Sequence, residues 1–312
     1  MINSNNNISE NVWEKIEKEI VRNEDKSFRN KKGLINQLWK QIVIWICILF
    51  ALFPVVWVVS AAFDPSNSIT GQRLIPKNAS LINFKKLLDR EEQPFLIWMY
   101  NSYKVAIINS FLVVCLTSLA GYAFSRMRFR GRRTGLFGII LVQMFPQMLA
   151  MVAIYLIVFR IGQYIPALGL DTHTGLILVY LGGAMGVNVW MTKNYFDTIP
   201  YSLEESAMLD GATPFQMFTR IILPLATPIL VVVFFLQFMG IYSEFVLARV
   251  LLASNDKLTL AVGLQSFIAD QYSKRWGIFS AAAIIGTIPV MVLFWLLQKQ
   301  LVTGLTSGAV KN

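Results

Sequence analysis

Long apolar runs alternate with shorter polar segments along most of this chain. Runs of about 20 residues without charge cross a ~30 Å hydrocarbon core as helices, because each helical residue adds ~1.5 Å. The pattern predicts an all-α integral membrane protein with six transmembrane helices. The expected spans are Gln41–Phe63, Val105–Ser125, Thr134–Phe159, Thr172–Thr192, Ile221–Ala248 and Trp276–Gln298.

The first 37 residues differ from the rest because they are polar and mixed in charge. Apolar residues recur at every fourth position from Ile8 to Ile20, which is typical of a helix with one apolar stripe. Such a helix can lie on a membrane surface or form a solvated leader. Acidic residues and the lack of a short apolar core argue against a secretory signal. We interpret 1–37 as a leader and 38–312 as a separate domain of six spans.

Two features interrupt the predicted spans. Pro146 falls near the middle of the third span, in the sequence QMFP, and a proline there kinks a helix. Broken spans can line polar pathways, although a plain structural kink explains the residue equally well. Gly182 and Gly186 form a G-x-x-x-G pattern in the fourth span, which favours close approach of another helix.

Composition and charge support a membrane protein whose loops have a defined orientation. Hydrophobic residues make up 55% of the chain and charged residues 15%, with a net charge of +10. The basic residues flank the apolar runs, which the positive-inside rule explains without a nucleic-acid partner. A dense basic cluster follows the second span: Arg126, Arg128, Arg130, Arg132 and Arg133. This cluster assigns its loop to the cytoplasm, and six spans then place both termini and the loop 193–220 on the same side.

The chain offers little for catalysis or metal binding. It has one histidine, His173, and its two cysteines fall inside apolar runs. It contains no GxxxxGK[ST] phosphate-binding loop. These observations argue against a histidine metal site and against nucleotide hydrolysis through a phosphate-binding loop on this chain.

The loop between the fourth and fifth spans carries the most specific pattern. Ser202 and Glu205 have the spacing of a capping box, and Thr213 and Gln216 repeat it around a proline. Gly211 lies between them, where the chain can turn through positive φ. The pattern predicts a short helix, a glycine turn and a second helix that enters the membrane. A short helix held at a membrane face is well placed to be pushed by a partner.

This segment resembles the EAA loop of ATP-binding-cassette (ABC) importer permeases. The residues that carry the likeness are Glu205, Ala207, Gly211, Ile221, Leu223 and Pro224. Ser206 is a departure, because the family usually has alanine there. From about residue 38 onward, NYFDTIPYSLEESAMLDGATP, LTLAVGLQ and GLTSGAVK look like the carbohydrate subfamily, in particular the smaller permease subunit of maltose/maltodextrin importers.

The resemblance implies one subunit of an ATP-driven sugar importer of the maltose/maltodextrin type, forming half of the translocation pathway in a bacterial cell membrane. The implied partners are a second permease, two copies of a cytoplasmic ATPase that holds ATP and Mg, an extracytoplasmic binding protein, the sugar and membrane lipid. The implied ATPase-coupling residues are Glu204, Glu205, Ser206, Ala207, Met208, Asp210 and Gly211, with the glutamates paired to ATPase cations. The cytoplasmic tail 299–312 is implied to reach the ATPase interface. Asn255, Asp256 and Lys257 are implied to contact the binding protein.

Polar residues inside spans are costly unless they face protein or water, so they are candidates for the sugar pathway. These candidates are Asn188, Gln237, Tyr242 and Glu244. Asn188 and Gln237 serve equally well as hydrogen-bond links between helices, and Glu244 could simply be wet. Aromatic residues such as Trp98 and Trp276 are expected as anchors at the membrane interface.

Three other interpretations remain open on the sequence. The solute could be a polyol, a sugar phosphate or an acidic oligosaccharide, because topology and motif would not change. A secondary transporter needs ionisable groups at mid-membrane, and the centres of the six predicted spans carry none. A membrane scaffold could recruit a cytoplasmic partner through the same loop without moving a solute.

Overall fold

The computed structural model describes residues 38–68, 72–89, 93–269 and 274–307, and these contain helices and no strand. Its contacts divide the chain into two units, one ending at Val58 and one running from Val59 to Asn312. Each is therefore considered by itself, and the sites below all lie in the second unit. The leader predicted for 1–37 lies outside the described residues.

Four described helices are long and apolar enough to cross a membrane, and the total is six if each of two bent helix pairs is one span. The four are Leu38–Phe63, α3 (Phe95–Arg126), α6 (His173–Thr198) and the first 27 residues of α13 (Trp276–Ser307). The prediction of an all-α membrane fold is confirmed. α3 begins ten residues earlier than expected, and α13 continues past Gln298 into the segment predicted to be a tail.

The third predicted span is two helices, α4 (Arg132–Gln143) and α5 (Gln147–Tyr164), which meet at 98°. Pro146 causes the break, because proline lacks an N–H and disfavours helical geometry in the residue before it. The last turn of α4 tightens accordingly, with the Met144 amide donating to the Leu141 carbonyl. The predicted break at Pro146 is confirmed, and the two helices count as one span only if the bent pair crosses the membrane as a unit.

The fifth predicted span is also divided. A turn of π-helix, η2 (Phe218–Ile222), and α9 (Leu223–Leu225) precede α10 (Thr227–Tyr242). The helical segment up to Leu225 bends by 73° against α10. The span therefore ends at Tyr242 rather than Ala248, and α11 (Val246–Leu251) is a separate short helix.

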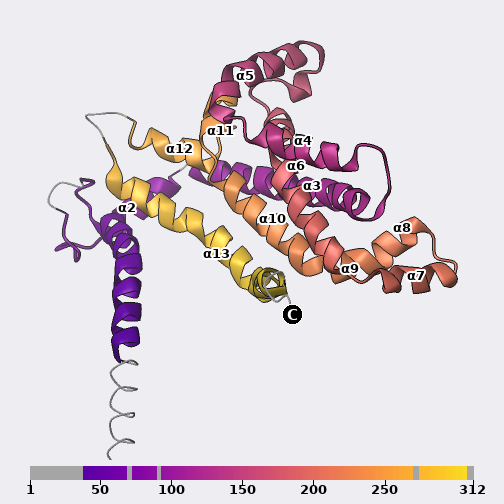
Figure 1. Ribbon diagram of the computed structural model, residues 1–312. Helices are drawn as coiled ribbons and strands as arrows, with labels where there is room; N and C mark the ends of the chain where they lie inside the picture. The colour runs from indigo at the N-terminus through magenta and orange to yellow at the C-terminus, as the bar shows by residue number, and fades with distance from the viewer. Residues whose placement is uncertain (1–37, 69–71, 90–92, 270–273, 308–312) are drawn as a thin grey trace, which may run out of the picture. The chain divides into compact units, whose positions relative to one another are not determined.

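The core of the second unit forms where α3 packs against α6 and α10, and α13 packs against α10 (Figure 1). Trp98 and Phe267 meet in it with ring centroids 5.9 Å apart. Trp98 is 2% exposed, so its predicted role as an interfacial anchor is wrong. A Cβ built on Gly263 of α12 (Leu260–Ser266) would lie 2.2 Å from the Trp98 ring, so glycine is required there.

A second buried cluster lies where α3 and α6 end. The rings of Tyr122 and Phe218 pack at a tilt with centroids 4.9 Å apart, and Phe196 and Ile222 are fully buried beside them. Because Phe218 and Ile222 belong to η2, this cluster packs the end of the segment between α6 and α10 against the helical bundle.

Candidate functional site

The predicted helix–turn–helix after the fourth span is present. α7 (Tyr201–Leu209) is followed by a turn in which Gly211 has a φ of +81°, and then by α8 (Pro214–Met217). Thr213 and Gln216 form the predicted capping box, each side chain bonding the other's backbone amide. We refer to residues 201–217 as the coupling segment.

The capping box predicted at Ser202 and Glu205 is wrong. α7 begins two residues earlier than this pattern requires, and Pro200 occupies the cap position without a side-chain hydrogen bond. Ser202 therefore lies inside the first turn, where its carbonyl accepts from the Ser206 hydroxyl at 2.9 Å. Proline before the helix fixes an extended backbone, which starts the helix without a polar cap.

The coupling segment is fastened to the bundle by a buried ion pair. Arg126, the last residue of α3, places Nε 2.5 Å from Glu204 Oε1, and the two side chains are only 5% and 7% exposed. The same guanidinium donates to the Ile199 carbonyl at 2.9 Å and lies over the Tyr201 ring, 4.2 Å from its centroid. The Ser125 hydroxyl completes the joint by donating to Asp197 at 2.6 Å.

This joint changes the role expected of Glu204. Its carboxylate forms a buried ion pair with Arg126 of the same chain, so Glu204 does not fit the expected pairing with a cation of a partner. Glu205 is exposed and remains available for that role. Arg126, taken from the sequence as one member of a cytoplasmic basic cluster, is a structural residue. Arg132 is another, because it donates to the Phe124 and Ser125 carbonyls at the end of α3.

The coupling segment exposes three large apolar side chains among polar ones. Leu209 is 90% exposed, Phe215 71% and Met208 58%. Ser206, Asp210 and Gly211 are also exposed, and Ala207 is half-buried. Large apolar side chains left exposed on a short stretch of chain are typical of a surface that binds a partner.

Three of the four predicted pathway residues line one pocket, which we call the polar pocket. It has a volume of about 220 Å³ and lies between α4, α6 and α10. Asn188 Nδ2 donates to Gln237 Oε1 at 3.3 Å, which links α6 to α10. Glu244 accepts from the Tyr180 hydroxyl at 2.5 Å and from the amides of Leu247 and Ala248. Glu244 is therefore held in place at the start of α11 and is not merely wet.

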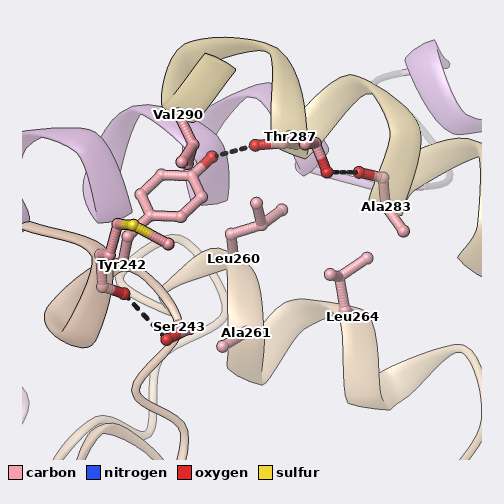
Figure 2. A pocket seen from close by; sticks show the side chains of 10 residues that line it. Tyr242, Ser243, Leu260, Ala261, Leu264, Ala283, Thr287 and Val290 are labelled. Carbon is pink, nitrogen blue, oxygen red and sulfur yellow. Dashed lines mark hydrogen bonds between the residues drawn. The ribbon is translucent and has the colours of Figure 1, made fainter. Parts of the chain in front are cut away.

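Tyr242 is not part of this pocket. Its side chain is buried, and its hydroxyl donates to the Gly286 carbonyl of α13 at 2.7 Å. Figure 2 shows that hydroxyl directed at the α13 backbone, beside a mainly apolar pocket lined by Leu260, Leu264 and Val290. The residues that sequence reasoning missed in the polar pocket are Tyr180 and Gln143.

The loop that contains Asn255, Asp256 and Lys257 is held by hydrogen bonds to the Asp171 carboxylate, an arrangement that we call the Asp171 clamp. Asp171 accepts from the Ala253 and Ser254 amides, the Ser254 hydroxyl and Lys257 Nζ. Burial alone would raise the pKa of the Asp171 carboxyl, but these hydrogen bonds outweigh it and hold the pKa well below its ordinary value of 3.8. The clamp leaves the side chains of Asn255 and Asp256 exposed.

Further groups hold the same loop through its backbone carbonyls. Trp98 Nε1 donates to the Asn255 carbonyl at 2.7 Å, and Asn101 Nδ2 donates to the Asp256 carbonyl at 2.8 Å. Because the backbone is fixed on both sides, the loop presents its exposed side chains in one arrangement.

Helices of membrane length and a loop with exposed apolar side chains are what a membrane protein that docks a partner requires. The family model described as "Binding-protein-dependent transport system inner membrane component" matches residues 113–306, and the chain belongs to this family. It is therefore a multi-pass permease subunit of an ABC importer and not itself a catalytic subunit.

Comparison with individual proteins agrees with this assignment. The chain is 44% identical to the maltose/maltodextrin transport system permease protein MalG of Vibrio vulnificus, over 90% of this chain and 98% of that protein. Among solved structures it resembles a bacterial ABC transporter involved in the import of the acidic polysaccharide alginate. That match has a TM-score of 0.67 and 25% identity, and covers 85% of this chain and 96% of the other. An alginate transporter in complex with a saccharide-bound periplasmic protein shares the fold, with a TM-score of 0.63, 17% identity, and coverage of 86% of this chain and 93% of the other.

Proposed function

We propose that this chain is the smaller permease subunit of an importer for maltose and maltodextrins. A second permease would complete the pathway, two cytoplasmic ATPase subunits would supply ATP and Mg, and a binding protein would deliver the sugar from outside. Both termini, the leader 1–37 and the coupling segment would face the cytoplasm, with 38–312 as the permease domain and 299–312 as a tail near the ATPase. The chain itself would need no cofactor.

The observation that carries this proposal is the coupling segment. Its inner side is fastened through Arg126 and Glu204, while its outer side exposes Met208 and Leu209. Burying an exposed side chain of this size stabilises a complex by about 1.5–3 kcal/mol. A partner that binds Met208 and Leu209 would therefore hold a segment that is fixed to α3 and α6. Motion of that partner would be transmitted to the membrane helices. Glu205, Ser206, Ala207, Asp210 and Gly211 would complete the contact.

The polar pocket favours a neutral sugar over an acidic one. Asn188 and Gln237 offer amide groups that match hydroxyls, whereas the Glu244 carboxylate would repel an anionic saccharide at close range. The alginate relatives therefore support the fold of the pathway more than its solute. Tyr242 would act on the pathway only indirectly, by holding α10 against α13. Asn255, Asp256 and Lys257 would form the contact surface for the binding protein.

The first test is purification of the complex from its native membrane in mild detergent, followed by mass spectrometry. We expect one related permease and an ATPase at two copies per complex. Leu209→Glu should leave the chain in the membrane but lose the ATPase, while Leu209→Met, which keeps an apolar side chain, should retain it. Retention of the ATPase by Leu209→Glu would refute the docking surface. Uptake of labelled maltose against labelled alginate fragments then separates the two solutes.

A further inference from the structure

Gln143 makes a contact that neither the motif nor the sugar pathway accounts for. It is the last residue of α4, three residues before Pro146. Its side-chain Nε2 donates to the Gly183 carbonyl of α6 at 2.6 Å, and its Oε1 accepts from the Val187 amide at 2.9 Å. One side chain thus joins the broken third span to α6 through two hydrogen bonds.

The two groups that Gln143 binds have a special relation. A carbonyl and the amide four residues later are the pair that bond to each other in a regular α-helix. The glutamine amide offers one donor and one acceptor, so it can satisfy both groups at once. If the side chain withdraws, Gly183 and Val187 still satisfy each other within α6, and no buried polar group is left without a partner.

The two helices approach each other closely at this contact. A Cβ built on Gly186 would lie 2.6 Å from Gln143 Oε1 and 2.9 Å from the Ile139 carbonyl, so α4 approaches α6 there with no side chain between. A Cβ on Gly182 would meet nothing within 4 Å. The predicted G-x-x-x-G contact is therefore made by Gly186 alone, at the point where Gln143 inserts.

We propose that Gln143 is a positioning residue for transport: its amide ties α4 to α6 in the conformation described here and is released in another conformation of the cycle, where the Gly183 carbonyl and the Val187 amide keep each other as partners within α6. The backbone is satisfied in both arrangements, which is the property that a two-state contact requires. Gln143 also lines the polar pocket and the larger apolar pocket beside α5, so its release would reshape the wall near Asn188. The inference rests on the proposed function, because it needs a transport cycle driven by a partner ATPase.

The test uses the full complex reconstituted in proteoliposomes. Gln143→Met keeps the size of the side chain and removes both hydrogen bonds, and Val142→Met is the matched control because Val142 is its neighbour and 74% exposed. We expect Gln143→Met to assemble in normal amounts. The ratio of ATP hydrolysis with and without binding protein should change by about fivefold or more, the effect of one ordinary hydrogen bond lost from a single state. The control should stay within about twofold of wild type by the same measure.

A second variant addresses the chemistry of the contact. Gln143→Glu can donate to Gly183 only when its carboxyl is protonated. Its hydrolysis ratio should therefore depart from wild type at pH 8 and return toward it as the pH falls. Wild type is measured in parallel, since Glu244 and Tyr180 line the same pocket.

Each outcome is decisive. An unchanged ratio in a normally assembled Gln143→Met complex overturns the inference, and so does loss of assembly in that variant, which would make the contact purely structural. A wild-type chain that assembles with no ATPase overturns the proposed function instead.

Discussion

Replacing Glu204 by glutamine should loosen the coupling segment from the bundle. The change leaves the Arg126 guanidinium buried and without its counter-charge. Breaking a buried ion pair from one side costs about 3–5 kcal/mol. Arg126 keeps the Ile199 carbonyl, the Ser125 hydroxyl and the Tyr201 ring as partners, so we expect a value near the lower end, about 3 kcal/mol.

The measurement is thermal unfolding of the purified complex, followed by tryptophan fluorescence. For a folded unit of this size, about 3 kcal/mol lowers the midpoint by roughly 6 °C or more. Glu205→Gln is the matched control, because the neighbouring carboxylate is exposed and its loss should cost within about 0.5 kcal/mol. The double variant Arg126→Met/Glu204→Met should regain most of the stability, since it leaves no buried charge unpaired.

Equal midpoints for Glu204→Gln and Glu205→Gln would refute this reasoning. They would mean that the ion pair contributes nothing to holding α7, whatever its geometry. A double variant as unstable as Glu204→Gln would instead show that the polar contacts of Arg126 carry the stability rather than its charge.

Three further predictions concern single positions. Gly211→Asp should keep the chain folded in the membrane but stop sugar uptake. Aspartate tolerates positive φ, and nothing lies within 4 Å of a Cβ built at this position, so a loss of uptake would report lost docking of the partner. Full uptake at normal expression would contradict the coupling role. Gly263→Ala should destabilise the fold by about 1–3 kcal/mol, because the new methyl group would clash with Trp98. Gly240→Ala is the control and should not destabilise the fold, since nothing lies within 4 Å of a Cβ built there. Equal unfolding midpoints for the two variants would contradict this prediction. Asp171→Asn should expose the loop 252–257 to proteolysis at neutral pH. Because the folded pKa of Asp171 is lowered, its contribution is present above pH 3.8 and lost as the pH falls below it. The difference from wild type should therefore shrink in acid, and a difference that is constant with pH would contradict the role of the charge.

The sequence predicted the local features of the coupling segment because they depend on neighbouring residues. The Thr213 cap and the Gly211 turn follow from short-range chemistry and are present. The Arg126–Glu204 pair could not be predicted, because the partners are 78 residues apart and five arginines compete for the role. The start of α7 was misplaced because an extended proline cap leaves no polar pattern to recognise.

The membrane helices show the same division. Pro146 predicted a break, but the 98° angle depends on how α4 and α5 pack, which no local pattern encodes. The cost of burying polar groups selected Asn188, Gln237 and Glu244, which the structure brings to one pocket, and their role in a sugar pathway stays a prediction. The same rule selected Tyr242, whose hydroxyl donates to the Gly286 backbone carbonyl and does not line the polar pocket. It would also have found Gln143, which was passed over as part of the QMFP kink.

The geometry of α6 explains how a push on the coupling segment could reach the polar pocket. Asn188 in the pocket and Thr198 at the end of α6 are joined by ten residues of continuous helix, about 15 Å. The joint to α7 is Ile199 followed by Pro200, and a residue before proline is restricted to extended geometry. Arg126 binds the Ile199 carbonyl, so the joint is also fixed to α3. Because this joint contains no glycine and has a hydrogen bond across it, it transmits motion rather than absorbing it. Further along the same helix, α4 meets α6 at Gly183 and Val187. Movement of α7 would therefore pass Asn188 and then reach the contact that Gln143 makes with α6.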